Sequence, residues 1–465
     1  MTEAGNNYSE KKTQLHISVR NLVEFIFREG DIDNRSSRAM SADAMMEGTR
    51  IHRKIQGSMG KEYQAEVPLS LVVEGDLYEL TVEGRADGIF TEDGKCFVDE
   101  IKGMYRKVEL FEKPVFVHRA QAMCYAYIFA LQNNMETIGI QMTYCNLETE
   151  QTKYFREGFS FEEIKKWFDD LMEEYGKWAT FQCEMKNQRQ ASIKELNFPF
   201  EYRPGQKKLV SDVYRTIMRQ KLMRRKLLFM QAPTGVGKTI STIFPAVKAV
   251  GEELADRIFY LTAKTITATV AKETFALLEK NGYRAKTIQI TAKEKLCPCD
   301  EMECNPVTCP YAKGHFDRVN DAVFDLLHRC EMIERDDILS QADRYTVCPF
   351  ELCLDTASWC DNIICDYNYV FDPNVYLKRF FQEGIKGDYI FLIDEAHNMV
   401  ERSRQMYSAQ IYKEDFLTVK RIMKEHSRSI EKALEKCNKI LLGMKRECEN
   451  YTVYDTFGNM VFSFM

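Results

Sequence analysis

The stretch Ala232-Pro-Thr-Gly-Val-Gly-Lys-Thr239 decides the fold prediction. It follows an apolar run at residues 227–231, which is expected to form a strand, and a helical pattern begins at Thr239. A glycine-rich loop between a strand and a helix brings backbone amides around phosphate groups. The stretch therefore predicts an α/β fold with a phosphate-binding loop. The alternative is an ordinary glycine-rich turn.

Each residue type of this loop suits ATP with Mg²⁺. Gly235 and Gly237 permit close approach of the backbone, and Lys238 supplies a cation for the β and γ phosphates. The Thr239 hydroxyl can bind Mg²⁺, although Ala232 stands where glycine is usual. The predicted nucleotide-binding residues of the loop are Thr234, Gly235, Val236, Gly237, Lys238 and Thr239.

A second motif, Asp394-Glu395-Ala396-His397, ends the apolar run at residues 389–393. Open α/β sheets bind their ligands at the carboxyl ends of their strands. We therefore expect Asp394 to hold Mg²⁺ through water, and Glu395 to orient or deprotonate the attacking water. Alone, such a motif could equally cap a surface helix.

Length and composition fit a globular protein of two or three domains, because the chain has 465 residues with 45% hydrophobic and 29% charged residues. The net charge of −6 means that any nucleic acid must bind in a local basic groove. Neither a signal peptide nor a long uncharged apolar run is present, so a cytoplasmic location is expected. There the 15 cysteines point to metal binding more than to disulfides.

Helices and strands alternate from residue 202 onward, with strands expected at 258–262, 363–365 and 389–393, which indicates a parallel sheet. Upstream, residues 79–83 and 96–100 alternate like strands of a mixed α/β domain. The polar stretch 184–194 has no apolar period and is the candidate linker. Residues 413–446 show a charged helical pattern. The predicted divisions are 1–185, a linker at 186–197, 198–407 with a cysteine-rich insertion at about 287–350, and 408–465.

Three further stretches accompany the loop and the acidic motif: Phe198-Pro-Phe-Glu-Tyr-Arg-Pro-Gly-Gln206, Tyr260-Leu-Thr-Ala-Lys-Thr265, and Ile364-Cys-Asp-Tyr-Asn-Tyr369 with Phe371-Asp-Pro373. Together they resemble the first motor half of the XPD/DinG family of iron-sulfur DNA helicases, which has a RecA-like fold. The resemblance implies that Gln206 lies near the adenine. It also implies that Thr262 and Lys264 contact single-stranded DNA, although they could merely end a strand.

The same resemblance implies a helical arch-like segment from residue 408 and a second RecA-like domain that would supply an arginine finger. That second domain does not lie within the 465 residues. We therefore expect efficient hydrolysis and strand separation to require this domain, and a second chain is one source of it.

Nine cysteines lie between residues 297 and 365. Cys297, Cys304, Cys309 and Cys348 match the order in which the resembling family holds a 4Fe-4S cluster, and the long last gap is unlike a compact zinc finger. Cys299 could replace Cys297, and scattered core cysteines are the alternative to a metal site. The remaining four are expected to be buried small hydrophobes: Cys330, Cys353, Cys360 and Cys365. The resemblance implies a structural role for the cluster beside the DNA path.

The N-terminal part carries a second set of polar residues, in Gly48-Thr-Arg-Ile-His52, Gly84-Arg-Ala-Asp87, Glu100-Ile-Lys102 and Gln121-Ala-Met-Cys-Tyr125. Asp87 and Glu100, on paired strands, could hold Mg²⁺ or Mn²⁺ with His52, while Lys102 stabilises developing charge. In this order the residues resemble PD-(D/E)XK nucleases of the RecB type over residues 16–183. In those nucleases the positions of Gln121 and Tyr125 organise the site. The alternative is a half-buried hairpin with solvated acids.

These observations favour an ATP-dependent DNA helicase that is fused to a metal-dependent nuclease, and the helicase is expected to move 5′ to 3′. The expected substrate of the chain is single-stranded or forked DNA, and its expected role is in repair or recombination. A second hypothesis is a nuclease whose motor half only binds nucleotide or DNA. A third is a single-strand-binding fragment without enzymatic activity.

Overall fold

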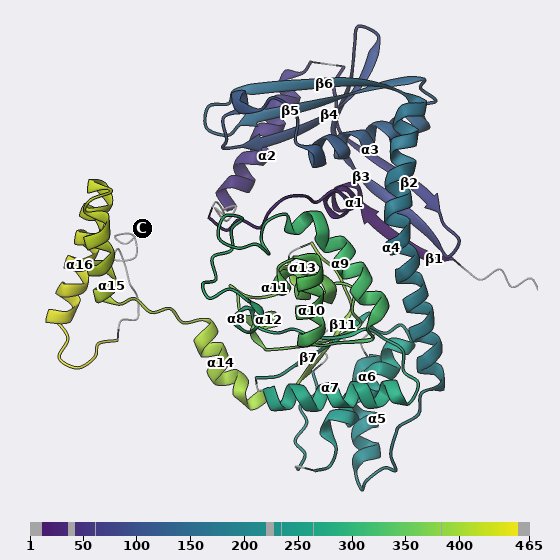
Figure 1. Ribbon diagram of the computed structural model, residues 1–465, viewed down its shortest axis with the longest axis vertical. Coiled ribbons are helices and arrows are strands. Elements are labelled where there is room, and N and C mark those ends of the chain that lie inside the picture. The colour runs from purple at the N-terminus through teal and green to yellow at the C-terminus, as the bar shows by residue number, and fades with distance from the viewer. Residues whose placement is uncertain are drawn as a thin grey trace, which may run out of the picture. The chain divides into compact units, whose positions relative to one another are not determined.

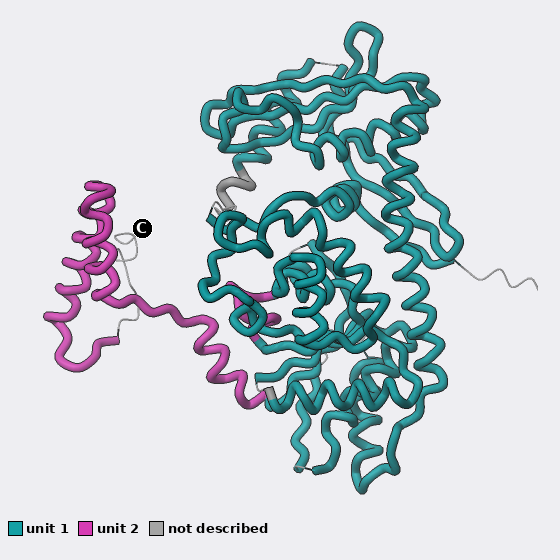
Figure 2. The backbone as a smooth tube through the Cα atoms, in the orientation of Figure 1, with its two compact units in different colours: residues 1–367, 377–395 teal, residues 368–376, 396–465 magenta. Residues whose placement is uncertain are grey.

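The computed structural model describes residues 12–35, 42–60, 62–219, 227–233, 235–263, 265–382 and 384–453, with only the backbone of 42–46 and 265. The chain forms two compact units (Figure 2), one of residues 1–367 with 377–395 and one of residues 368–376 with 396–465. The predicted divisions 1–185 and 198–407 each contain one sheet of the first unit, whereas residues 368–376 and 396–407 group with the second unit. Thr234, Lys264 and Met465 lie outside the described residues.

A six-stranded mixed sheet dominates the N-terminal part (Figure 1). Its strand order is β1-β3-β4-β5-β6, and β2 also pairs with β3. The pairs β1/β3 and β4/β5 are parallel, whereas the others are antiparallel. The predicted strands at 79–83 and 96–100 are confirmed, because they lie within β3 and β4. The bounds are β1 (Thr13–Ser18), β2 (Gln64–Glu74), β3 (Tyr78–Glu92), β4 (Lys95–Met104), β5 (Thr137–Asn146) and β6 (Thr152–Ser160).

Helix α3 (Phe116–Gln132) carries most of the packing against this sheet. It is apolar on nearly every side, as expected for a helix that is buried all round. Ala122 and Ile128 are fully buried in one core with Val98 of β4 and Ile140 of β5. The other elements of this part are α1 (Val19–Ile26), α2 (Ala42–Ser58) and the short 3₁₀ helix η1 (Val108–Leu110).

Helix α4 (Phe161–Glu195) runs from the first sheet to the second, so the predicted irregular linker at 186–197 is wrong up to Glu195. A capping box between Ser160 and Glu163 starts the helix. Its polar end stays helical because Glu, Met, Lys, Gln and Arg favour helices. That end is also fixed to the second sheet's helices: Ile193 packs into their core, and Lys248 Nζ donates to its carbonyl at 2.7 Å.

The second sheet has five strands in the order β11-β7-β10-β8-β9, and every pair is parallel. This confirms the α/β prediction and the strands expected near 258–262, 363–365 and 389–393. The strands are β7 (Arg257–Leu261), β8 (Thr287–Gln289), β9 (Met332–Ile333), β10 (Asn362–Cys365) and β11 (Tyr389–Ile393). The helices around them are α5 (Gln206–Met218), α6 (Lys238–Gly251), α7 (Thr265–Lys280) and α13 (Lys378–Phe381).

The strand predicted at residues 227–231 is wrong, because residues 227–233 form no strand. An apolar run becomes a buried strand only where a neighbouring strand pairs with its backbone. Here β11 ends the sheet, and among the described residues no strand pairs with its outer edge. Leu227 and Phe229 are accordingly exposed, at 70% and 80%.

The cysteine-rich insertion is helical, with α8 (Lys293–Leu296), α9 (His315–Arg329), α10 (Arg335–Tyr345) and α11 (Pro349–Ala357). The second unit contains α12 (Asn368–Phe371), η3 (Ala396–Asn398), α14 (Met399–Met406), α15 (Lys413–Met423) and α16 (Arg428–Arg446). The helical pattern predicted for residues 413–446 is thus confirmed as two helices.

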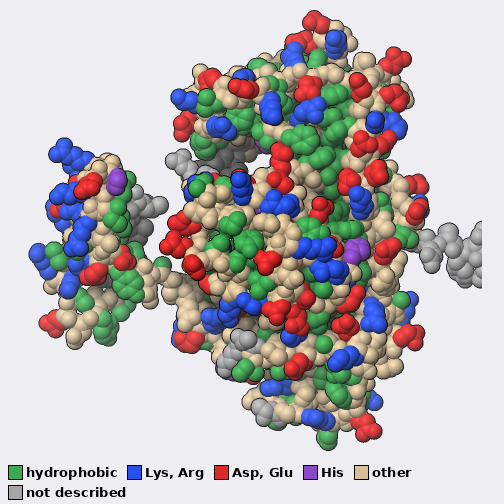
Figure 3. Space-filling view, viewed as in Figure 1, with side chains coloured by type: hydrophobic (Ala, Val, Ile, Leu, Met, Phe, Trp, Pro, Cys, Tyr) green, Lys and Arg blue, Asp and Glu red, His purple; other side chains and the backbone are tan. Residues whose placement is uncertain are grey.

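The surface carries both signs of charge. Lys and Arg side chains alternate with Asp and Glu over the face shown in Figure 3, in line with the small net charge. No described helix has the length and apolar composition needed to cross a membrane.

Candidate nucleotide and metal sites

The glycine-rich loop leads into α6, as predicted. Gly235 and Gly237 have φ angles of +83° and +76°, a left-handed conformation that favours glycine. Gln206, at the start of α5, donates from Nε2 to the Val236 carbonyl at 3.1 Å and accepts from the Arg203 amide at 3.0 Å. Arg203 also donates to the Gly235 carbonyl. Gln206 therefore supports the loop backbone, a role that the sequence did not indicate.

Tyr260 links the two nucleotide motifs. This side chain of β7 is buried, and its hydroxyl lies near the side chains of both Thr239 and Asp394. Burial, with the nearby Asp394 carboxylate, raises the pKa of Tyr260, so the hydroxyl stays protonated. The predicted Mg²⁺ residues Thr239 and Asp394 are thus brought to the same end of the sheet. The sequence contained Tyr260 in a family-like stretch without revealing this contact.

The acidic motif lies directly after β11. The Asp394 amide donates to the Leu261 carbonyl at 2.9 Å, which continues the pairing with β7. Glu395 has a φ of +49°, which is rare for a residue other than glycine, and its amide donates to Asp394 Oδ1 at 3.0 Å. Tyr367 donates its hydroxyl to the carbonyls of Asp394 and Glu395. This backbone is held in an unusual conformation at the predicted catalytic pair.

Thr262, the predicted DNA contact, is 5% exposed, and its hydroxyl bonds to that of Thr267. Its amide continues the ladder by donating to the Cys365 carbonyl at 3.0 Å. In this conformation Thr262 ends a strand, and its contact with DNA stays a prediction.

The predicted cluster cysteines are half-buried. Cys299 Sγ lies 3.8 Å from Cys309 Sγ and also interacts with Cys297, whereas Cys304 lies beside Cys348 and Lys293. Burial raises the pKa of Cys348 to about 11, and burial with Cys309 raises that of Cys299 to about 12. Within the described ranges, no three His, Cys, Asp or Glu side chains are arranged to hold a metal ion. The thiols thus form two subgroups: Cys297, Cys299 and Cys309 on the loop between α8 and α9, and Cys304 of that loop with Cys348 at the start of α11.

The other cysteines of this stretch follow the prediction in part. Cys353, Cys360 and Cys365 are buried, and burial raises the pKa of each thiol. Cys330 is only half-buried, because it follows the last residue of α9 and is not packed inside a helix or strand.

A segment from the N-terminal part is hydrogen-bonded to the cysteine loop. The amides of Ile32 and Asn34 donate to the carbonyls of Ala312 and Cys304 at 2.9 and 3.0 Å. In return, the Gly314 amide donates to Asp31 Oδ1 at 2.6 Å. No motif in the sequence indicates this contact, because main-chain groups make most of it.

The N-terminal acidic residues come together as predicted. His52 Nδ1 lies 3.5 Å from Asp87 Oδ1, and Lys102 Nζ lies 2.7 Å from Glu100 Oε1 and 3.2 Å from Gln121 Oε1. Tyr125 completes the set through its hydrogen bond with Gln121. The predicted alternative of solvated acids is wrong for Glu100, which is 2% exposed.

Glu100 is an incompletely bonded buried acid. Its Oε2 is buried and has no hydrogen-bond partner among the described residues. Burial, together with the Asp87 charge, raises its pKa to about 8. Asp87 in turn raises the pKa of His52 through a hydrogen bond. The carboxylates of Asp87 and Glu100, with Glu100 Oε2 lacking a hydrogen-bond partner among the described residues, fit a hard divalent cation. Such a cation would neutralise the charges of both carboxylates.

Comparison with known proteins gives a partial relationship. Residues 276–416 match the model of the DEAD_2 family. Over 76 residues the chain is 26% identical to the Fanconi anemia group J protein homolog of Gallus gallus, covering 16% of this chain and 6% of that protein. A structure titled "Crystal structure of SSO0001" shows 20% identity and a TM-score of 0.25 over 35% of this chain and 78% of that chain. One titled "XPD_Helicase" shows 17% identity and a TM-score of 0.34 over 57% and 45%.

Proposed function

We propose, on the premise that residues 276–416 are related to DEAD_2 helicases, that this chain carries the ATP-binding half of a DNA-acting motor. The supporting observation is the Tyr260 hydroxyl between Thr239 and Asp394, which joins the phosphate-loop and acidic motifs at one end of a parallel sheet. The finer proposal is an ATP-dependent helicase of the iron-sulfur type that moves 5′ to 3′ on single-stranded or forked DNA.

The residues divide the chemistry between them. The loop amides and Lys238 bind the phosphates, and Thr239 with Asp394 positions Mg²⁺. Glu395 orients or deprotonates water at the γ phosphate. Bound Mg²⁺ withdraws charge from the phosphate oxygens.

ATP binding by the full chain tests this proposal. We expect Lys238→Ala to weaken binding of Mg·ATP at least tenfold, because the phosphates lose their cation. The exposed Lys280→Ala is the matched control and leaves binding unchanged. Equal affinity in Lys238→Ala and the parent chain would falsify the proposed site. DNA-stimulated hydrolysis is then measured with a chain extended to include a second RecA-like domain.

We further propose that the N-terminal part is a metal-dependent DNA nuclease. The support is Glu100 Oε2, a buried oxygen without a hydrogen-bond partner in the described structure, opposite Asp87. Mg²⁺ or Mn²⁺ held by Asp87, Glu100 and His52 would supply an activated water. Lys102, fixed by Gln121, stabilises the charge that develops on the phosphodiester.

Cleavage of a labelled single strand in Mn²⁺ without ATP tests this activity. We expect Asp87→Ala to remove it and Asp76→Ala, at an exposed turn, to retain it. Cleavage that persists in Asp87→Ala would assign it to another site or a contaminant. If the chain cleaves DNA but does not hydrolyse ATP, a second function is favoured. The chain would then be a nuclease whose motor half only binds nucleotide or DNA. One observation supports that second function: residues 227–233 are not paired into the sheet.

For the cysteine loop we propose a 4Fe-4S cluster bound by Cys297 or Cys299 together with Cys304, Cys309 and Cys348. The support is the gathering of half-buried thiols on the loop between α8 and α9 and, with Cys348, at the start of α11. Iron, sulfide and visible absorption are measured after anaerobic purification. Cys348→Ser should lose them and Cys448→Ser should retain them. Zinc in place of iron would exclude the cluster but keep the metal site.

A further inference from the structure

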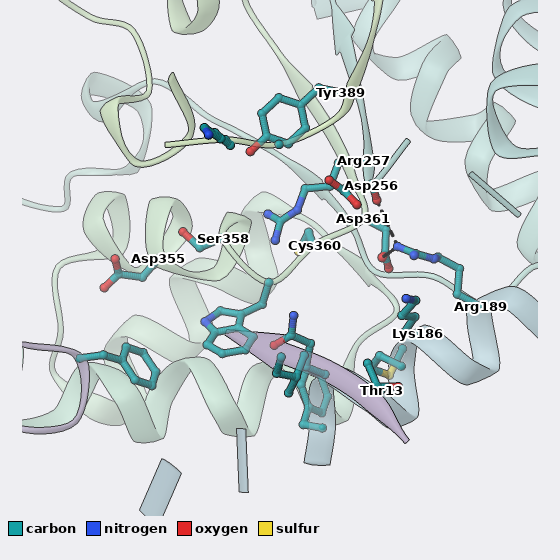
Figure 4. A pocket seen from close by; sticks show the side chains of 18 of the residues that line it. Thr13, Lys186, Arg189, Asp256, Arg257, Asp355, Ser358, Cys360, Asp361 and Tyr389 are labelled. Carbon is teal, nitrogen blue, oxygen red and sulfur yellow. Dashed lines mark hydrogen bonds and ion pairs between the residues drawn. The ribbon is translucent and has the colours of Figure 1, made fainter. Parts of the chain in front are cut away.

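A cavity of about 600 Å³ lies where the N-terminal part meets the second sheet (Figure 4). Its walls come from β1, from the end of α4 and from the amino ends of β7 and β11. The residues that matter below are Arg189, Arg257, Trp359, Asp361, Lys386 and Tyr389.

This cavity is separate from the nucleotide loop. Tyr389 begins β11, whereas Asp394 follows the last residue of that strand. Because a strand advances about 3.3 Å per residue, the two ends of β11 lie roughly 15 Å apart. A ligand in the cavity therefore cannot be the nucleotide bound at Lys238.

The acidic side chains of the cavity are largely matched. Asp361 pairs with Arg189 (Figure 4), and its second oxygen accepts the Lys286 amide at 2.9 Å. Asp355 is paired with Arg28 at 2.8 Å and also with a second arginine. Asp256 Oδ2 accepts the Asp388 amide at 2.9 Å.

Two cationic groups, Arg257 and Lys386, retain donors for a ligand. Arg257 stacks on the Phe380 ring at 5.2 Å, and its nearest polar partner is the Ala357 carbonyl at 3.5 Å. Neither Arg257 nor Lys386 forms an ion pair within the described part of the chain. Arg189 is 8% exposed and its charge is matched by Asp361, so it lines the cavity without offering a free charge. In Figure 4 the Arg257 side chain points into the cavity. The cavity therefore favours an anion.

Aromatic rings make another part of the wall. Trp359 is half-buried and is held by Phe25 and Trp178, with ring centroids at 5.7 and 4.5 Å. Tyr389 packs edge-on against Phe259 at 5.3 Å. Fixed rings of this kind suit a planar heterocycle. The volume lies within the range of small-molecule sites, about 300–1,000 Å³.

We propose that this cavity binds a nucleoside monophosphate, with the phosphate at Arg257 and Lys386 and the base against Trp359. An aromatic wall beside an unmatched guanidinium and an unmatched ammonium group favours this class over inorganic phosphate. The proposal does not depend on the function proposed above.

The test titrates dAMP into the full chain in EDTA, where metal-dependent binding is removed. Binding is followed by calorimetry and by tryptophan fluorescence. We expect saturable quenching, an affinity reduced at least tenfold in Arg257→Gln, and an unchanged affinity in the exposed control Arg421→Gln. Trp359→Phe should remove the quenching while calorimetric binding remains. Thermal unfolding of each variant confirms that it is folded.

Several outcomes would overturn the proposal. These are an absence of saturation at millimolar dAMP, equal affinity in Arg257→Gln and the parent chain, or loss of binding in Lys238→Ala. Inorganic phosphate that binds as tightly as dAMP would contradict the nucleoside part.

Discussion

Burial sets the protonation of Glu100. In the fold its pKa is raised from 4.5 to about 8, so between these values the folded chain holds a proton that the unfolded chain has lost. Without metal, this group's contribution to the free energy of unfolding therefore falls as pH rises from about 4.5 to about 8, and stays constant above. A bound cation would reverse this loss of stability, because it favours the ionised form of Glu100.

We expect Glu100→Gln to stabilise the metal-free chain at pH 8 by roughly 1–3 kcal/mol and to change it little at pH 5. Denaturant unfolding in EDTA at the two pH values measures this, with the exposed Glu173→Gln as control. Added Mn²⁺ should stabilise the parent chain more than Glu100→Gln. A Glu100→Gln chain that is less stable at pH 8 would contradict the raised pKa of this buried carboxyl.

Gly237 combines a left-handed backbone with a crowded position. A Cβ here would lie 2.7 Å from Gln206 Nε2, which supports the loop. We expect Gly237→Ala to cost about 1 kcal/mol of stability and to weaken Mg·ATP binding. Gly282→Ala is the matched control, because Gly282 has a φ of +101° with nothing within 4 Å of a Cβ. It should cost similar stability and leave ATP binding unchanged. Equal ATP affinity in both variants would show that the loop tolerates the methyl group.

At the residue scale the sequence was most informative where chemistry fixes residue type and spacing. His52, Asp87, Glu100 and Lys102 are brought together as predicted because adjacent strands and a short polar spacing determine their positions. Tyr260 could not be identified as the link between motifs, because its partners lie far along the chain.

At the scale of helices and strands, the periodicity of apolar residues predicts some elements correctly and others wrongly. The second sheet could be predicted because short apolar runs alternate with helical patterns. Residues 184–194 were misread since α4 projects a polar surface there, and only Arg189 and Ile193 of this stretch are buried. At residues 227–231 the error was the reverse, because a strand was predicted where none forms. The run is apolar, but an apolar run alone does not provide a neighbouring strand to pair with.

Continuity of α4 can be measured at Gln188, which is exposed. We expect Gln188→Gly to be less stable than Gln188→Ala by about 1 kcal/mol, since glycine loses more backbone entropy in a helix. Denaturant unfolding of the two variants gives the difference. The same pair of substitutions at the exposed loop residue Glu201 is the control and should differ less. No difference at Gln188 would support the irregular linker.

On the scale of the whole molecule, α4 joins two sheets with separate cores into one compact unit. Neither core could reveal this from sequence, because the contacts across the junction join residues far apart in the chain, such as Trp178 and Trp359. Arg189 makes the polar part of the junction: it donates to Asp361 and, at 3.2 Å, to the Asp256 carbonyl, and it is 8% exposed. A buried ion pair and aromatic packing thus couple the two sheets.

We expect Arg189→Ala to destabilise the chain by about 3–5 kcal/mol, because Asp361 then loses its buried partner. In this variant the second sheet should unfold before the first. Calorimetry should therefore show two unfolding transitions for Arg189→Ala and fewer for the parent chain. Arg20→Ala removes the exposed pair with Glu24 and should cost at most about 0.5 kcal/mol. If Arg189→Ala and Arg20→Ala unfold alike, the ion pair does not couple the sheets, and the apolar contacts of Ile193 with α6 and of Trp178 with Trp359 must join them.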